Sequence, residues 1–116
     1  INVSSWSGNH VSLLSGVSYT SSKHALNAMT ETINMKYCNL GIRATALCPG
    51  EVATGILDKR PKKLSSEQKN KMLQPDDLGQ TIVFLCQMPK HVCINELTIS
   101  PTWHRRYIAD LGIEKL

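Results

Sequence analysis

The fold is decided by the stretch VSYTSSKHALNAMTETINMKYCNLGIRATALCPGEVAT, which runs over residues 17–54. Apolar side chains recur at helical spacing in its first part and predict a helix over residues 17–40; they are Leu26, Met29, Ile33, Tyr37 and Leu40. Gly41 supplies the left-handed residue that commonly ends a helix. The short, mostly apolar run 42–48 stops at a Pro-Gly pair, which is typical of a strand covered on both faces. A helix that leads straight into a buried strand indicates a parallel α/β layer.

The segments on either side of this stretch continue the same alternation. Residues 1–4 are interpreted as the tail of a strand, and the Ser- and Gly-rich residues 6–18 as a loop. Downstream we predict a short helix over 65–73, a longer helix over 75–88 and a last strand within 92–99. The order strand, helix, strand, helix, strand favours a right-handed parallel sheet with helices on its faces.

Length and composition limit the class of protein. The chain has 116 residues, of which 41% are apolar and 19% charged, as in one soluble globular domain. No stretch approaches the ~18 to 20 consecutive apolar residues of a membrane-spanning helix, and no signal peptide is visible. Because the chain does not begin with Met, we expect it to start partway through a longer protein.

Cysteines and histidines argue against a disulfide framework and a metal site. The four cysteines form no CxxC pair, and three of them sit in apolar runs where free Cys behaves as a small hydrophobic residue; they are Cys38, Cys48, Cys86 and Cys93. The four histidines are scattered, without metal-ligand spacing. We therefore expect a metal-free protein of the cytoplasm.

The net charge of +4 is concentrated in one stretch, residues 59–71. Clustered Lys and Arg could bind nucleic acid, but no aromatic residues that would stack on bases are interleaved with them. A solvated loop followed by a short helix is the favoured interpretation, with no nucleic-acid partner.

Tyr19 and Lys23 lie four residues apart on the predicted helix, so both are expected on one face, one turn from each other. This spacing has a chemical use. A phenol has a pKa near 10, and a neighbouring ammonium lowers that pKa toward the range in which acid/base catalysis works best. A surface tyrosine beside a lysine is the alternative interpretation.

Two further polar segments are expected beside this pair. Ser4 and Ser5 end the first predicted strand, and PGEVAT at residues 49–54 ends the next one. In open parallel sheets, ligands bind at the carboxyl ends of the strands. The three segments therefore predict one site at this edge of the sheet.

Together these segments resemble the C-terminal half of the short-chain dehydrogenase/reductase family. NVSS at residues 2–5 is similar to the serine-bearing strand end of that family, SYTSSKHAL at 18–26 to its YxxxK helix, and PGEVAT at 49–54 to its PGxVxT loop. The resemblance implies an α/β fold, the C-terminal half of a Rossmann-like doubly wound parallel sheet with about three strands. Residues 1–102 would be the C-terminal part of an NAD(P)-binding domain, and residues 103–116, which match nothing in the family, a tail.

The resemblance also implies roles for individual residues. Tyr19 would be the general acid/base that gives a proton to the substrate oxygen in reduction and takes it back in oxidation. Lys23 would hold the hydroxyls of the nicotinamide ribose and favour the ionised phenol. Ser5 would hydrogen-bond the substrate carbonyl; the family usually places this serine thirteen residues before the tyrosine, whereas Ser5 lies fourteen before it, which leaves Ser4 and Ser7 as weaker candidates.

The cofactor implied by the resemblance is NAD or NADP, because the residues that distinguish the two lie upstream in the family. Val52 and Thr54 would contact the nicotinamide carboxamide, while Pro49 and Gly50 shape the turn. In a purely structural interpretation, the Pro-Gly pair only stops a strand and Thr54 only caps a turn.

The Gly-rich phosphate-binding turn of the dinucleotide fold is missing from the sequence. We therefore expect the first strand to expose an open edge, and the 116-residue chain alone to be poorly stable or to associate, without affinity for NADH or NADPH. The complete protein is expected to be an oxidoreductase that interconverts an alcohol and a carbonyl compound of small size, and to form a homodimer or homotetramer. A truncated, non-catalytic scaffold of the same fold is the alternative. The basic stretch falls where the family covers its substrate, so a negatively charged or bulky substrate is a further hypothesis, to be tested by changing Lys62 and Lys63 to Glu.

Overall fold

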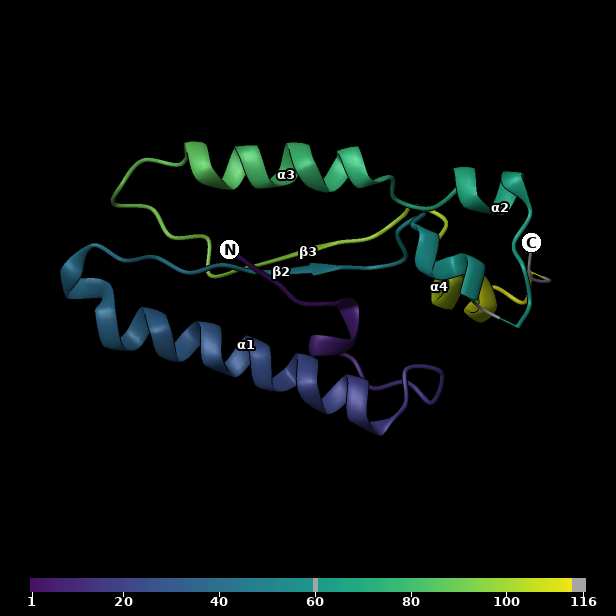
Figure 1. The fold of residues 1–116 in the computed structure, drawn as a ribbon, viewed down its shortest axis with the longest axis horizontal. Helices are drawn as coiled ribbons and strands as arrows, with labels where there is room; N and C mark the ends of the chain where they lie inside the picture. Colours follow the sequence, from purple (N-terminus) through teal and green to yellow (C-terminus); the bar gives the residue numbers. More distant parts are fainter. Residues whose placement is uncertain (60, 114–116) are drawn as a thin grey trace.

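The computed structural model describes residues 1–59 and 61–113, and a parallel sheet forms its centre (Figure 1). The sheet has three strands in the order β1 (Asn2–Val3), β2 (Ala46–Pro49), β3 (Glu96–Ile99). Both pairings are parallel, with Val3 opposite Leu47 and Leu47 opposite Leu97. This topology confirms the predicted α/β fold.

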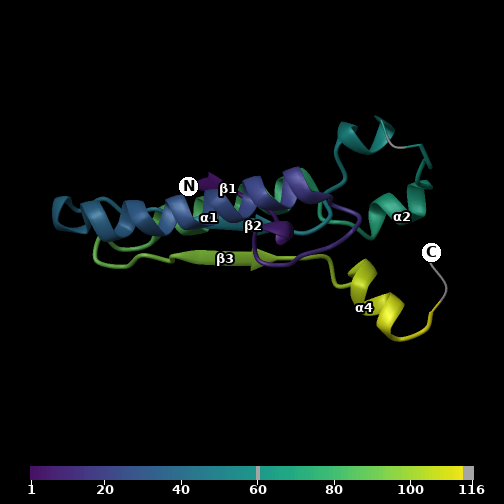
Figure 2. The ribbon, with the colours of Figure 1, turned by 90° about the horizontal axis from the view of Figure 1, so that it is seen from below.

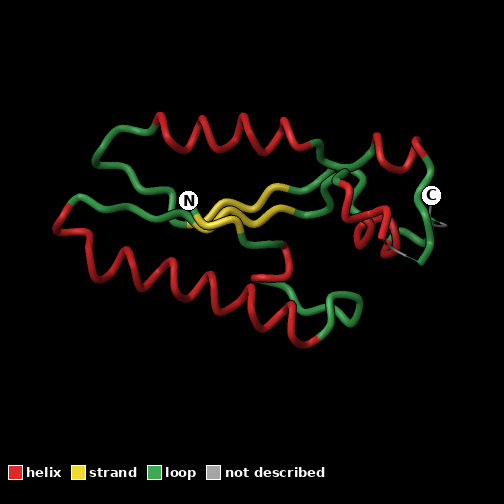
Figure 3. Tube along the Cα trace, in the orientation of Figure 1, coloured by secondary structure: helices red, strands yellow, loops and turns green. Residues whose placement is uncertain are grey.

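The long helices lie on opposite faces of the sheet, as Figures 1 and 3 show. Helix α1 (Val17–Tyr37) connects β1 to β2, and helix α3 (Pro75–Gln87) precedes β3. The predicted helix over 17–40 is correct except at its end, where Cys38–Leu40 form the 3-10 turn η2 and Gly41 follows at φ 73°. Glycine pays no steric cost in this left-handed conformation, which explains why the helix stops there.

The strands are shorter than the apolar runs that predicted them. Over 42–48 only Ala46 onward is strand. One reason is that the Asn34 side chain takes both backbone groups of Ala44: its amide oxygen accepts from the Ala44 N–H at 2.6 Å, and its amide nitrogen donates to the Ala44 carbonyl at 2.8 Å. These bonds satisfy the backbone without a neighbouring strand. Likewise, only four residues of 92–99 are strand.

The buried face of α1 differs from the predicted apolar face. Met29 is 49% exposed and Leu40 68%, whereas Thr20 and Thr30 are buried. Thr30 is matched to the sheet by hydrogen bonds: its Oγ1 donates to the Leu26 carbonyl at 2.8 Å and accepts from Asn2 Nδ2 at 2.9 Å. Small polar side chains can pack closely when their hydrogen bonds are made. Leu26, Ile33 and Tyr37 are half-buried, so the apolar periodicity predicted this face correctly at three positions and failed at Met29 and Leu40.

Strand β2 is the centre of the core. Leu47 and Cys48 are fully buried, and Leu85 of α3 is buried as well. Arg43, just before β2, ties down the C-terminal end of α3: its guanidinium donates to the carbonyls of Pro89 at 2.6 Å and Val92 at 2.7 Å. A cation is favoured at the negative end of a helix.

Short helices gather beyond the carboxyl ends of β2 and β3 (Figures 1 and 2). They are the 3-10 helix η3 (Gly55–Lys59), helix α2 (Ser66–Asn70) and helix α4 (Arg105–Asp110). Helix α2 lies within the predicted segment 65–73, and its N-terminus is stabilised by a capping box between Ser65 and Gln68. Helix α4 was not predicted, because six residues are too few to show a periodic pattern.

Only one of the cysteines behaves as a core residue. Cys48 is buried, but Cys38, Cys86 and Cys93 are exposed free thiols, so the apolar character of their neighbours was a poor guide to burial. Within residues 1–59 and 61–113, no helix is long and apolar enough to span a membrane. Over the same ranges no group of three or more potential metal ligands is found.

Candidate functional site

Ser5 begins the short 3-10 helix η1 (Trp6–Gly8), directly after the strand β1 segment. Its Oγ accepts a hydrogen bond from the Ser7 N–H at 3.1 Å, which caps η1 and leaves the hydroxyl proton available. The other two serines are more buried: Ser4 is 4% exposed and Ser7 7%. Ser4 Oγ donates to the Lys23 carbonyl at 3.4 Å, and Ser7 Oγ lies 2.7 Å from Ser15 Oγ.

Tyr19 and Lys23 share one face of α1, as their spacing predicted. The Lys23 ammonium lies 5.7 Å from the centre of the Tyr19 ring. It also donates a hydrogen bond to the Val3 carbonyl at 3.2 Å, so it is anchored at the carboxyl end of β1, two residues before Ser5. Tyr19 remains 47% exposed. The structure thus brings the tyrosine and the lysine to the end of the strand that leads to Ser5.

The approach of η1 to α1 depends on a glycine. A Cβ at Gly8 would lie 2.6 Å from Ser4 Oγ and 2.7 Å from Asn27 Nδ2, so any larger residue would force these two side chains to move. Gly8 therefore lets the segment after β1 pack directly on α1, next to the turn that carries Lys23.

PGEVAT leaves the carboxyl end of the neighbouring strand β2. Pro49 is the last residue of β2, and the Gly50 N–H donates to the Ile99 carbonyl at 2.7 Å. Val52 pairs with Leu73 in an isolated bridge, and Thr54 is exposed. These residues lie at the same edge of the sheet as Ser5, but no hydrogen bond joins them to Tyr19 or Lys23 among the described residues.

A polar network that the sequence did not reveal connects the end of η1 to α1 and β3. Asn9 Nδ2 donates to Glu96 Oε1 of β3 at 2.6 Å, and Asn27 Nδ2 of α1 donates to Asn9 Oδ1 at 2.9 Å. Both amides also lie against the buried Cys48 thiol, 3.6 and 3.7 Å from its sulfur. Burial raises the pKa of Cys48, with Asn27 opposing the shift and Glu96 adding to it, so this thiol is neutral and serves packing. No signal in the sequence links these distant residues.

A cluster of four rings joins η1 to α4. Trp6 stacks on His10 with ring centres 4.2 Å apart, and the ring centres of His104 and Tyr107 lie 4.3 Å and 6.1 Å from that of Trp6. The buried His104 also caps α4, because its Nδ1 accepts from the Arg106 N–H at 3.2 Å. Burial lowers the pKa of His104; the nearby Glu51 opposes the shift, whereas His10 and the arginines add to it.

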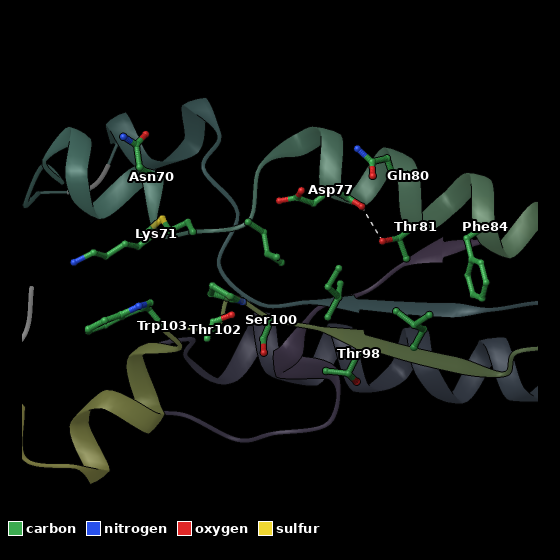
Figure 4. A pocket seen from close by; sticks show the side chains of 15 residues that line it. Asn70, Lys71, Asp77, Gln80, Thr81, Phe84, Thr98, Ser100, Thr102 and Trp103 are labelled. Carbon is green, nitrogen blue, oxygen red and sulfur yellow. Dashed lines mark hydrogen bonds between the residues drawn. The ribbon is translucent and has the colours of Figure 1, made fainter.

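A groove and a cavity lie apart from Ser5, Tyr19 and Lys23. An open groove of about 1020 Å³ runs between α3 and β3 toward Trp103 (Figure 4). A second cavity of about 600 Å³ lies beyond the carboxyl ends of the strands, between Leu14, Glu51 and the α2 and α4 helices. Neither is lined by Ser5, Tyr19 or Lys23, which lie at an accessible surface beside β1.

Comparison with known proteins now identifies the family. The family model of the short chain dehydrogenases matches residues 1–65. The chain belongs to the short chain dehydrogenase family. The matched part contains Ser5, Tyr19, Lys23 and PGEVAT, the segments that carried the resemblance.

Among curated relatives of this short chain dehydrogenase, human dehydrogenase/reductase SDR family member 11 is 32% identical over 110 residues, covering 88% of this chain and 42% of the relative. An uncharacterized oxidoreductase of Staphylococcus aureus (strain USA300) is 30% identical over 101 residues, covering 87% and 41%. The chain therefore spans about two fifths of the length of these relatives.

Solved structures give the same result for the fold. A beta-ketoacyl-[ACP] reductase from Bacteroides thetaiotaomicron superposes with a TM-score of 0.68 at 32% identity, covering 88% of this chain and 40% of the other. An alcohol dehydrogenase from the archaeon Thermococcus sibiricus, complexed with 5-hydroxy-NADP, gives 0.71 at 26% identity, covering 89% and 41%.

Proposed function

We propose that this chain is the C-terminal part of a nicotinamide-dependent oxidoreductase that interconverts an alcohol and a carbonyl compound. The observation that carries the proposal is the pairing of Tyr19 and Lys23 at the end of β1, with the Lys23 ammonium 5.7 Å from the ring and hydrogen-bonded to the Val3 carbonyl. Family membership and the similarity to known dehydrogenases and reductases support it.

The residues present fit a nicotinamide cofactor, NAD or NADP. The Lys23 ammonium has three N–H donors and uses one of them in its hydrogen bond to the Val3 carbonyl. The other two would bind ribose hydroxyls. Val52 and Thr54, in the loop after β2, would meet the carboxamide. When bound, the reduced cofactor supplies the hydride that goes to the carbonyl carbon.

The side chains of this part of the protein would handle the proton. Tyr19 gives its phenolic proton to the carbonyl oxygen in reduction and takes it back in oxidation, while the Lys23 cation stabilises the phenolate that forms. Ser5 donates its hydroxyl proton as a hydrogen bond to the same oxygen, where negative charge develops. We assign this role to Ser5 rather than Ser4 or Ser7, because the latter two are buried and already hydrogen-bonded.

The size of the exposed surface supports the proposal that the chain is one part of a larger fold. The accessible area is 8026 Å², whereas a folded monomer of this mass is expected to expose about 6300 Å². The outer edge of β1 has no partner among the described residues, and Ile1 and Val3 are half exposed there. A cofactor-binding half carrying the Gly-rich turn would cover this edge.

Assembly and location complete the proposal. The exposed apolar residues of α1, Met29 and Met35 among them, would pack against a second copy, giving a homodimer or a homotetramer. The free thiols agree with the reducing cytoplasm.

The reaction class is tested by isotope transfer in the complete protein. Cofactor labelled with deuterium at the transferred position of C4 is incubated with the protein and a panel of ketones and aldehydes. We expect one deuterium on the carbinol carbon of the product, detected by mass spectrometry. Product without deuterium would contradict direct hydride transfer from the cofactor, and no product with any carbonyl compound in the presence of either cofactor would favour a non-catalytic scaffold.

A further inference from the structure

The cavity of about 600 Å³ has the lining of a binding site for an amphipathic molecule. Its volume falls within the range of small-molecule sites. Most of its wall is apolar and comes from Leu14, Leu64, Met72, Trp103 and Ile108. Leu14 belongs to the loop before α1, Leu64 and Met72 to the segments around α2, Trp103 to the segment before α4, and Ile108 to α4. The cavity is therefore assembled from segments that are far apart in the sequence.

The cations that line this cavity are not equivalent. Arg105 is neutralised by Glu51, with Nη2 3.0 Å from Oε1. Lys71 pairs with Glu67 at 3.0 Å and lies 4.6 Å from the centre of the Trp103 ring; Figure 4 shows these two side chains beside each other. Lys62 also lines the cavity and has no carboxylate partner within residues 1–59 and 61–113.

We propose that the substrate of the proposed reaction is an amphipathic anion: a hydroxy or oxo compound with an apolar chain that ends in a carboxylate. The apolar chain lies along Met72, Trp103 and Ile108, and the carboxylate binds the ammonium of Lys62. This inference rests on the proposed function only for the reacting group; the affinity for an amphipathic anion is a property of the cavity itself.

The charges also set the direction in which the substrate lies. Glu51 and Arg105 form an ion pair without net charge at their end of the cavity, so Lys62, at the other end, is the more favourable partner for a carboxylate. Glu51 belongs to PGEVAT, and Leu14 lies five residues before Tyr19. The reacting carbon is therefore placed at the end formed by Glu51 and Leu14, and the anionic group at the Lys62 end.

Lys63 is a matched control for Lys62. The two residues are adjacent, equally charged and exposed, but only Lys62 lines the cavity. In the sequence the two lysines belong to the same basic stretch, whereas in the structure they differ in their position relative to the cavity.

The test measures binding to the complete protein by isothermal titration calorimetry, with decanoate and decan-1-ol as probes. Changing Lys62→Glu should weaken decanoate binding about tenfold or more and leave decan-1-ol binding unchanged, because only the carboxylate meets the new charge. Lys63→Glu should change decanoate binding less than about twofold. Ile108→Trp, which fills the cavity, should weaken both probes.

Equal losses in the Lys62 and Lys63 variants would overturn the proposal, as would decanoate binding no tighter than that of decan-1-ol. Failure of the reaction assignment gives a different result. If decanoate binds and depends on Lys62 while no deuterium transfer occurs with any carbonyl compound, the cavity is established and the oxidoreductase is not. If neutral ketones are reduced and decanoate neither binds nor inhibits, the oxidoreductase stands and this substrate class is wrong.

Discussion

Gly8 has no Cβ, and this allows η1 to pack closely on α1. The Cβ that any other residue carries would lie 2.6 Å from Ser4 Oγ and 2.7 Å from Asn27 Nδ2. Because η1 begins at Ser5, the position of the proposed substrate-binding hydroxyl depends on this contact.

We predict that Gly8→Ala lowers the free energy of unfolding by about 1–3 kcal/mol, since a packed contact is overfilled. The control is Gly79→Ala in α3, where a Cβ meets nothing within 4 Å. There alanine should stabilise the helix by up to about 1 kcal/mol. Urea denaturation of both variants decides the matter: similar losses at the two positions would contradict the close contact at Gly8.

At the same scale, the Tyr19–Lys23 pair could be predicted because residues four apart on a helix share a face whatever the rest of the fold does. Ser5 could be placed because it follows a strand. The serine capping of η1, the network of Asn9 and Asn27, and the difference between Lys62 and Lys63 could not be predicted, because each depends on segments that meet only in three dimensions.

Among the elements, α3 is held at its C-terminal end by Arg43. Its guanidinium binds the carbonyls of Pro89 and Val92 and, at 3.4 Å, that of Cys86. Carbonyls at and beyond the end of a helix lack intrahelical donors; the Pro89 carbonyl also accepts from the Val92 N–H at 2.9 Å. The cation in addition opposes the helix dipole.

Changing Arg43→Met should therefore cost roughly 2 kcal/mol of stability, the value of hydrogen bonds to a charged group. Hydrogen exchange should become faster at the amides of residues 86–93. Arg106→Met removes the same charge from an exposed side chain that makes no hydrogen bond to the described part of the chain, and it should leave both quantities nearly unchanged. A loss of equal size in the two variants would assign the effect to net charge instead.

Helix α4 is docked by a histidine that must be neutral to cap it. His104 Nδ1 accepts from the Arg106 N–H, and burial holds the pKa of His104 below its ordinary value. A lowered pKa means that the undocked segment binds protons more readily than the docked one, so docking is complete above pH about 6.5 and weakens as the pH falls below it.

We predict that the protection factors of the α4 amides, which are exchange rates corrected for the intrinsic effect of pH, fall as the pH is lowered from 7 to 5. His104→Asn keeps a capping oxygen without a titrating group and should remove this dependence. A wild-type profile that matches the variant's would show that His104 does not control docking.

Some elements could be predicted from the local sequence pattern and others could not. The long helices and their ends follow from Gly41 and from the Pro75 start. The buried face of α1 was predicted only in part, because Thr20 and the hydrogen-bonded Thr30 are buried there whereas Met29 and Leu40 are exposed. Helix α4 has a cap that pairs with Trp6, almost the whole length of the chain away, and so left no local pattern.

The whole molecule is more open than a domain of its length. Its radius of gyration is 15.9 Å, against about 13 Å for a compact chain of this size. Its longest dimension is 49 Å against 29 and 28 Å for the others. The sheet with its two long helices and the group of short helices lie one after the other along the long axis (Figure 2).

We predict that the 116-residue chain, produced alone, associates or melts without a cooperative transition, because the edge of β1 offers unpaired backbone groups and half-exposed Ile1 and Val3. Sedimentation velocity and a thermal scan would detect either behaviour. A monomer with one sharp transition would show that the open edge needs no partner.

The account as a whole depends on Tyr19 acting on a substrate held beside a nicotinamide, and the most direct measurement is the turnover of the complete protein carrying Tyr19→Phe. We expect kcat to fall by at least about 100-fold, while the dissociation constant of the cofactor changes little; Tyr37→Phe, at the other end of the same helix, should retain full turnover. Unchanged turnover in the Tyr19 variant would contradict the account, and loss of cofactor binding together with turnover would make this tyrosine an architectural residue.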